Sequence, residues 1–183
     1  IASMGMRVVL VHGSRPQIEE LMSLRKLEGQ FYKGVRITGP QELECVKEAC
    51  GETRFDIEAA FSQGLPNTPM QHSRIKVVSG NFVTARPMGI IDGVDYLHTG
   101  VVRKVDAESI QDLLSRGNIV LVSPTGFSPT GEAFNLTTED VATAIAVAIH
   151  ADKLILSVGV DGVRIQGEKQ QDLTAQQAQA LIQ

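Results

Sequence analysis

The apolar positions of this chain fall into short continuous runs and longer periodic stripes. The runs are rich in Val, Ile and Leu and are predicted to be strands buried on both faces, at residues 6–11, 119–123 and 154–158. In the stripes, apolar residues recur every three or four positions, which predicts helices at residues 16–27, 40–64, 107–115 and 137–150. Buried strands that alternate with helices indicate a central sheet of mainly parallel strands.

A second pattern, in which apolar and polar residues alternate, occupies the middle of the chain. It covers residues 74–87 and 94–105, with glycines at the predicted bends. A shorter alternating stretch at residues 31–38 predicts a hairpin that bends at Gly34. We therefore expect one α/β domain over residues 1–183, a three-layer α/β/α sandwich with a mainly parallel central sheet and a β-rich insert at one end. Because the chain starts without an initiator methionine and stops inside a helical pattern at 174–181, the domain is expected to be truncated at both ends.

Composition narrows the class of partner. The 183 residues are 43% hydrophobic and 21% charged, as in soluble globular proteins. The net charge of −4 argues against nucleic acid or an anionic membrane as the main partner, and no apolar run approaches the ~20 residues that cross a bilayer. A secretory signal pattern is absent. Cys45 and Cys50 lack the spacing of a zinc site, so we expect no metal, two free thiols and a cytoplasmic location.

The most suggestive polar segment follows the first predicted strand. His12, Gly13, Ser14 and Arg15 lie between that strand and a helix that opens at Pro16. Backbone N–H groups at such a strand-to-helix turn, together with the helix dipole, can bind a phosphate or a carboxylate. An ordinary tight turn explains the same residues, so this segment alone leaves both interpretations open.

Other polar positions border apolar segments. Arg36 is a lone arginine in the predicted hairpin and is either an anion clamp or a surface charge. Asn135, Thr137 and Glu139 lie where a loop enters a helix, so they are either N-cap and dipole partners or ligand groups. Nothing in the spacing of the acidic residues there requires Mg²⁺. His98 is predicted to be structural, and the sequence lacks the GxSxG, GxGxxG and Walker A motifs.

Four segments, in order, resemble the amino-acid kinase family. That family carries a VHGGGP-type loop, a GxRVT hairpin, a GHVG strand segment and an NxNAD helix start. The corresponding segments here are VHGSRP at 11–16, GVRIT at 34–38, LHTG at 97–100 and NLTTE at 135–139. The resemblance covers almost the whole chain and implies the kinase-like α/β/α fold.

Departures from the kinase pattern imply that phosphoryl transfer is lost. Ser14 and Arg15 replace two loop glycines, and their side chains are expected to crowd the space beside the transferring phosphate. Glu139 replaces the aspartate that organises the catalytic lysines, and Thr137 replaces an asparagine on the substrate side. The family's LSDVxG turn becomes LSVGVDG at 156–162. Because phosphoryl transfer depends on positioning and charge neutralisation, these changes predict an inert cleft.

Further segments resemble the kinase-like domain of bacterial N-acetylglutamate synthases. They are HGSRPQI at 12–18, VVSGNF at 77–82, DGVDYLHTG at 92–100 and TGEAFNL at 130–136. In that family the kinase-like half does no chemistry and carries feedback inhibition by L-arginine. A C-terminal GNAT domain, absent from this chain, transfers acetyl from acetyl-CoA to glutamate in the first step of arginine biosynthesis.

The resemblance therefore implies a regulatory domain of an amino-acid N-acetyltransferase, with no cofactor in this segment. L-arginine is the implied allosteric partner, at a site mostly outside the segment, and a homo-oligomer, at least a dimer, is implied as well. A vestigial ligand cleft without catalytic residues is expected at the carboxyl ends of the strands. Its predicted members are His12, Gly13, Ser14, Arg15, Arg36, Asn135, Thr137 and Glu139. Two other functions stay open: a divergent N-acetylglutamate kinase that uses ATP and Mg²⁺, and a scaffold whose pocket binds nothing.

Overall fold

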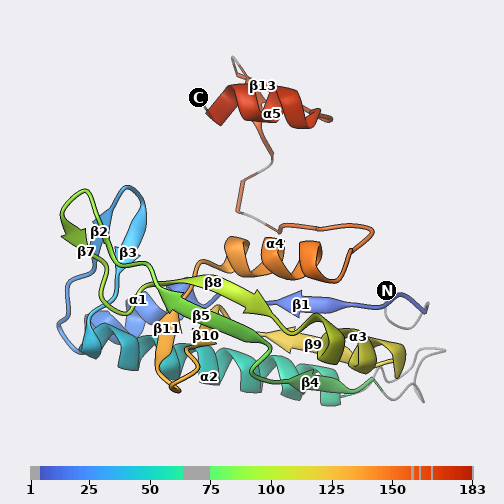
Figure 1. Ribbon diagram of the computed structural model, residues 1–183, viewed down its shortest axis with the longest axis horizontal. Coiled ribbons are helices and arrows are strands. Elements are labelled where there is room, and N and C mark those ends of the chain that lie inside the picture. The colour runs from blue at the N-terminus through green and yellow to red at the C-terminus, as the bar shows by residue number, and fades with distance from the viewer. Residues whose placement is uncertain (1–4, 64–74, 158, 161, 166, 183) are drawn as a thin grey trace.

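A three-stranded parallel sheet forms the centre of the fold (Figure 1). The computed structural model describes residues 5–63, 75–157, 159–160, 162–165 and 167–182. The strand order is β1 (Val9–Val11), β9 (Ile119–Val122) and β4 (Val77–Ser79), with Val9 and Val78 both opposite Val120. All four residues of β9 are buried, as expected for the middle strand of a sheet covered on both faces.

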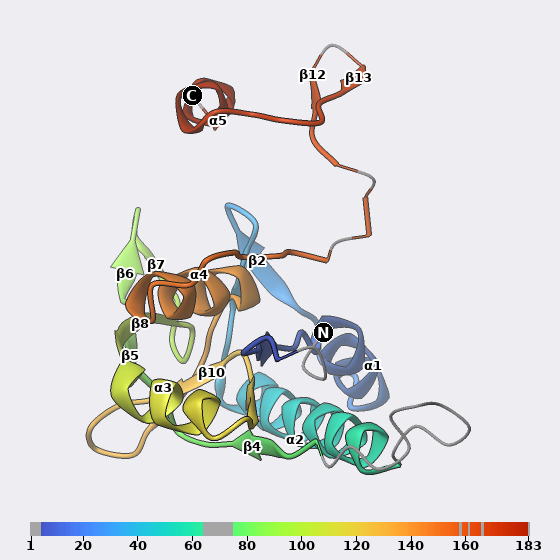
Figure 2. The same ribbon diagram turned by 90° about the vertical axis from the view of Figure 1, so that its right-hand side faces the viewer.

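Helices cover both faces of this sheet (Figure 2). On one side α1 (Arg15–Leu24) packs against α2 (Pro40–Ser62) through a cluster that includes Ile18, Met22 and Val46. On the other side α3 (Ala107–Ser115) and α4 (Thr138–Ala148) pack on β9 and β8 through Ile110, Val120 and Ile145. Alternate residues of a strand point to opposite faces, so one strand serves both layers. The predicted three-layer α/β/α sandwich is confirmed.

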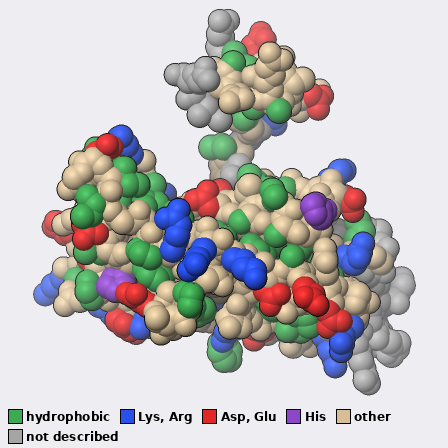
Figure 3. Space-filling model, viewed as in Figure 1, with side chains coloured by type: hydrophobic (Ala, Val, Ile, Leu, Met, Phe, Trp, Pro, Cys, Tyr) green, Lys and Arg blue, Asp and Glu red, His purple; other side chains and the backbone are tan. Residues whose placement is uncertain are grey.

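A four-stranded mixed sheet extends the fold beside the parallel strands. Its order is β11 (Ala133–Asn135), β10 (Thr125–Phe127), β5 (Val83–Pro87) and β8 (Gly100–Val105). On the face seen in Figure 3, Lys and Arg side chains gather over this sheet, where Arg86, Arg103 and Lys104 are exposed. The expected β-rich insert is therefore present. One part of it, β4, belongs instead to the central sheet because it pairs in parallel with β9.

Two short hairpins lie together at one end of the molecule (Figure 1). They are β2 (Gln30–Tyr32) with β3 (Val35–Ile37), and β6 (Ile90–Ile91) with β7 (Val94–Asp95). The Tyr96 hydroxyl donates a hydrogen bond to the Tyr32 carbonyl at 3.2 Å, and Lys33 forms an ion pair with Asp92 at 2.6 Å. The hairpin predicted at 31–38 is confirmed, with Gly34 at a φ of 79°, which suits glycine.

The prediction of a third buried central strand at 154–158 is wrong. Residues 154–157 are irregular, and Leu154, Ile155 and Leu156 are 44%, 77% and 51% exposed, whereas Val158 lies outside the described residues. A strand is stable only where a neighbour offers backbone hydrogen bonds, and no described strand pairs with this segment. The chain instead leaves the body after α4 and runs to β12 (Arg164–Ile165), β13 (Glu168–Lys169) and α5 (Ala175–Ile182) (Figure 1).

Two further sequence expectations bear on location and chemistry. Cys45 and Cys50 are buried free thiols on α2, as predicted. Among the described residues, no helix combines the length and the hydropathy needed to cross a bilayer.

Candidate functional site

The turn from β1 into α1 is held by a chain of side-chain hydrogen bonds. His12 Nε2 lies 2.8 Å from Ser123 Oγ at the end of β9, and His12 Nδ1 lies 3.2 Å from Ser14 Oγ. Ser14 Oγ donates to Thr53 Oγ1 on α2 at 3.3 Å, and Thr53 donates in turn to the Ala49 carbonyl at 2.8 Å. His12 and Ser14 are both buried. The turn is therefore tied to both neighbouring elements, β9 and α2.

We expect this network to make stability depend on pH below neutrality. Burial lowers the pKa of His12 below its usual value of 6.5, a hydrogen bond with the Gly13 backbone partly opposes this, and the charge of Arg54 adds to it. The unfolded chain then binds more protons than the native chain. The stabilisation by neutral His12 is thus complete above about pH 6.5 and is lost as the pH falls through the folded-state pKa.

Urea unfolding of the native sequence and of His12→Gln, between about pH 7.5 and pH 5, measures this contribution. The loss of stability on acidification should be smaller in His12→Gln. The matched control is His150→Asn, because His150 is exposed and has a φ of 52°, which asparagine tolerates. An acid dependence that is the same in His12→Gln and in the native sequence would show that His12 is not the titrating group.

Ser14 and Arg15 do not crowd the space at the end of the sheet, contrary to expectation. The Ser14 hydroxyl points to His12 and Thr53, and the Arg15 side chain is 72% exposed and pairs with Glu19 at 3.0 Å, one turn along α1. Arg15 is the first residue of α1, and its i,i+4 partner draws the guanidinium along the helix surface. The directions of both side chains are therefore set by their hydrogen-bond and ion-pair partners and not by their place in the turn.

Arg36 is held against α1. Its guanidinium is buried, donates to Glu19 Oε1 at 3.3 Å and to Met22 Sδ at 3.2 Å, and lies 4.6 Å from the centre of the Phe31 ring. Burial lowers the pKa of Arg36, and the negative charge of Glu19 works against this. The structure thus uses Arg36 to join the β2–β3 hairpin to α1, with the guanidinium already paired.

Asn135 reaches the end of β3 through a small network of hydroxyl groups. Its Nδ2 donates to Thr38 Oγ1 at 3.0 Å. The Thr99 hydroxyl donates to the Arg36 carbonyl at 2.6 Å, and its Oγ1 lies 2.9 Å from Thr38 Oγ1, close enough to accept the hydrogen of Thr38. Thr38 and Thr99 are buried. Thr38 and Thr99 lie in two of the four motif segments, yet no side-chain role was predicted for either of them. None was predicted for Thr53 or Ser123 either.

The start of α4 lies beside the β1–α1 turn. A Cβ built on Gly13 would lie 3.8 Å from Oγ1 of Thr138. Thr137 is the N-cap residue without a side-chain cap bond, and Glu139 is an exposed residue of the first turn, where a carboxylate favours the helix dipole. The structure therefore brings His12, Gly13 and Ser14 to the start of α4, while the side chains of Arg15 and Arg36 turn away to Glu19.

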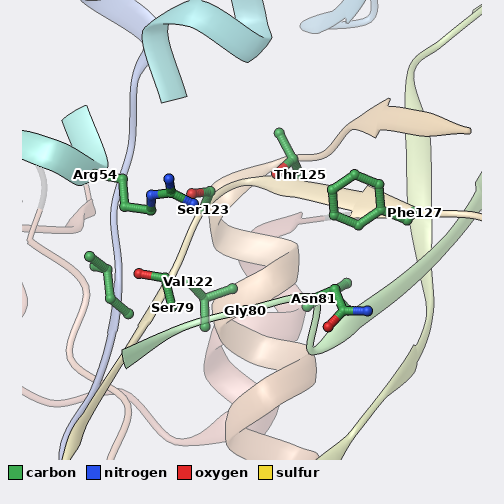
Figure 4. Close-up of a pocket in the computed structure, with 10 residues that line it drawn as sticks. Arg54, Ser79, Gly80, Asn81, Val122, Ser123, Thr125 and Phe127 are labelled. Carbon is green, nitrogen blue, oxygen red and sulfur yellow. The ribbon is translucent and has the colours of Figure 1, made fainter. Parts of the chain in front are cut away.

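A cavity of about 270 Å³ lies at the carboxyl ends of β4 and β9, next to this turn (Figure 4). We call it the Arg54 cavity; its polar lining residues are Arg54, Ser79, Asn81, Ser123 and Thr125. Ser123 connects it to His12, yet none of the eight predicted cleft residues lines it. Within the described part of the chain, no three His, Cys, Asp or Glu residues are grouped so as to hold a metal ion.

Comparison with known sequences decides the family. Residues 1–180 match the Amino acid kinase family. The chain belongs to the amino-acid kinase family. The membership implied by the four motif segments is therefore confirmed. These segments lie at the β1–α1 turn, at the β2–β3 hairpin, between β7 and the first residue of β8, and at the start of α4.

Individual relatives of this amino-acid kinase domain are acetyltransferases. The amino-acid acetyltransferase of Ralstonia nicotianae is 61% identical over 177 residues, and that of Ectopseudomonas mendocina is 51% identical over 179 residues. The crystal structure of N-acetylglutamate synthase from Neisseria gonorrhoeae, complexed with coenzyme A and L-arginine, matches 98% of the chain with a TM-score of 0.87 at 35% identity. The chain spans 39%, 41% and 42% of the lengths of these three proteins.

Proposed function

We propose that this amino-acid kinase domain is the regulatory domain of an N-acetylglutamate synthase and that it senses L-arginine for feedback inhibition. The protein that contains it would be a cytoplasmic, homo-oligomeric amino-acid N-acetyltransferase that acetylates glutamate with acetyl-CoA. The observation that carries the proposal is the match over 98% of the chain to the Neisseria synthase complexed with coenzyme A and L-arginine.

The geometry of the cleft supports a domain without phosphoryl-transfer activity. Arg36 is paired with Glu19, and Ser14 is engaged by His12 and Thr53, so both side chains serve packing. Glu139 projects from the exposed first turn of α4 and carries one methylene more than the family's aspartate. A displacement of about 1 Å can cost roughly a hundredfold in rate.

An ADP-release assay separates this proposal from a divergent kinase. The whole protein is mixed with ATP, Mg²⁺ and N-acetylglutamate, and ADP release is compared with that of the same mixture without N-acetylglutamate. We expect the two rates to be equal. Turnover on the order of ~1 s⁻¹, which is ordinary for kinases, would overturn the proposal. Isothermal titration of the whole protein with L-arginine, with D-arginine as the control, separates a sensor from a scaffold, because a scaffold binds neither.

A further inference from the structure

The Arg54 cavity has the position and the composition of a ligand site. It opens at the carboxyl ends of two parallel strands, β4 and β9, which is where open α/β sheets bind ligands. In Figure 4 the guanidinium of Arg54 points toward Ser123, with Ser79 nearby. Val83, Leu121 and Phe127 supply apolar walls. The cavity thus offers one charged end and an apolar remainder, at a size that suits a molecule smaller than a typical drug.

Arg54 has an unused donor at this cavity. Its Nε is buried and has no hydrogen-bond partner among the described residues. Glu58 Oε1 lies 3.7 Å away, beyond hydrogen-bond distance, and already accepts from Ser79 Oγ at 2.7 Å. The Arg54 side chain is 42% exposed, but this buried N–H makes no hydrogen bond, so an anionic oxygen in the cavity would stabilise the arrangement.

Ser123 presents the opposite hydrogen-bonding character. Each hydroxyl has one hydrogen to donate: Thr53 donates to the Ala49 carbonyl, and Ser14 donates to Thr53. In its contact with His12, Ser14 Oγ must therefore accept the hydrogen of Nδ1. A proton on Nδ1 makes Nε2 an acceptor, and the Ser123 hydroxyl then donates to it across 2.8 Å. The lone pairs of Ser123 Oγ therefore remain for a donor in the cavity.

Charge selects among ligands that carry both an anionic oxygen and a donor. Arg54 and Glu58 form a loose ion pair at the charged end, so their charges sum to zero. A zwitterion matches such a pair better than a net anion does, because it adds no unbalanced charge to a half-buried site.

From these three features we infer that the Arg54 cavity binds an α-amino acid with a short apolar side chain. Its carboxylate accepts from Arg54, its ammonium group donates to Ser123 Oγ, and its side chain lies against Val83, Leu121 and Phe127. The site is distinct from the cleft predicted at the start of α4, and the inference does not depend on the proposed regulation by L-arginine.

L-valine is the probe, titrated into the 183-residue chain while the Nε–Hε signal of Arg54 is followed by NMR. We expect a saturable shift with a Kd of about 1 mM, a reasonable affinity for about eight heavy atoms. Isovalerate is L-valine without the ammonium group and isobutylamine is L-valine without the carboxylate, so each is expected to bind at least about tenfold more weakly. A signal that does not move with L-valine, or equal binding of either analogue, would overturn the inference.

Variants test the two anchoring residues. Arg54→Gln and Ser123→Ala are each expected to weaken L-valine binding about tenfold or more. Arg116→Gln is the matched control, because Arg116 is 69% exposed and pairs with Asp112 on α3. Circular dichroism verifies that each variant is folded. Should Ser123→Ala fail to fold, Arg54→Gln decides, since Arg54 makes no short hydrogen bond in the described structure. L-valine affinity that is unchanged in Arg54→Gln contradicts the assignment.

Discussion

Replacing Ile145 by alanine is expected to lower the free energy of unfolding by about 2–5 kcal/mol. Ile145 lies on α4, is 2% exposed and packs in the cluster that joins α3 and α4 to β9. The substitution removes buried carbon atoms and leaves a cavity between the helix layer and the sheet. The close-packed neighbours cannot move far enough to fill this cavity.

Ile155→Ala is the matched control for this experiment. Ile155 follows α4 by a few residues but is 77% exposed, so the same substitution should change stability by less than about 0.5 kcal/mol. Urea denaturation of both variants gives the two values. A loss of similar size at Ile155 would show that the segment at 154–157 is buried in solution and would restore the predicted third strand.

Glu19→Gln is expected to cost about 1–2 kcal/mol of stability, since it removes the carboxylate that pairs with buried Arg36. Glu19 Oε1 also pairs with exposed Arg15, but an exposed pair of this kind adds little. The loss is therefore expected to come mainly from the buried guanidinium between the hairpin and α1, which keeps its charge but loses its ion-pair partner Glu19.

The neighbouring Glu20→Gln provides the control, because Glu20 is exposed and makes the same change of charge on the same helix. We expect its effect to stay within about 0.5 kcal/mol. Unfolding curves of the two variants, at one salt concentration, are compared directly. Equal effects would mean that the general charge of α1, rather than the contact with Arg36, determines the stability.

The central fold was predictable where local pattern and tertiary pairing agree. The segments predicted as strands at 119–123 and 154–158 have the same apolar character. The first contains β9, with a parallel partner on each side, whereas the described part of the second, residues 154–157, forms no strand. The second segment would be buried only beside a neighbouring strand, and its own residues do not determine whether such a strand is there. The bend at Gly34 was predictable because its physical cause is local.

The positions of His12 and Ser14 along the chain were predictable, but the directions of the side chains around them were not. His12 and Ser14 lie where the strand-to-helix turn places them, because turn residues follow their strand. The direction of Arg36 depends on Glu19 and Phe31, two contacts made only after α1 and the hairpin meet. The role of Arg54 was not predictable for a similar reason. In the sequence it is one of several charged residues in the segment that forms α2, and only the fold directs its side chain toward Ser123.

The central claim is that this domain regulates acetyl transfer. The most direct measurement is the initial rate of N-acetylglutamate formation by the whole protein, from acetyl-CoA and glutamate, as L-arginine is added. D-arginine serves as the control. The proposal predicts a saturable fall in rate with L-arginine and no change with D-arginine. A rate that stays constant as L-arginine rises into the millimolar range would contradict it.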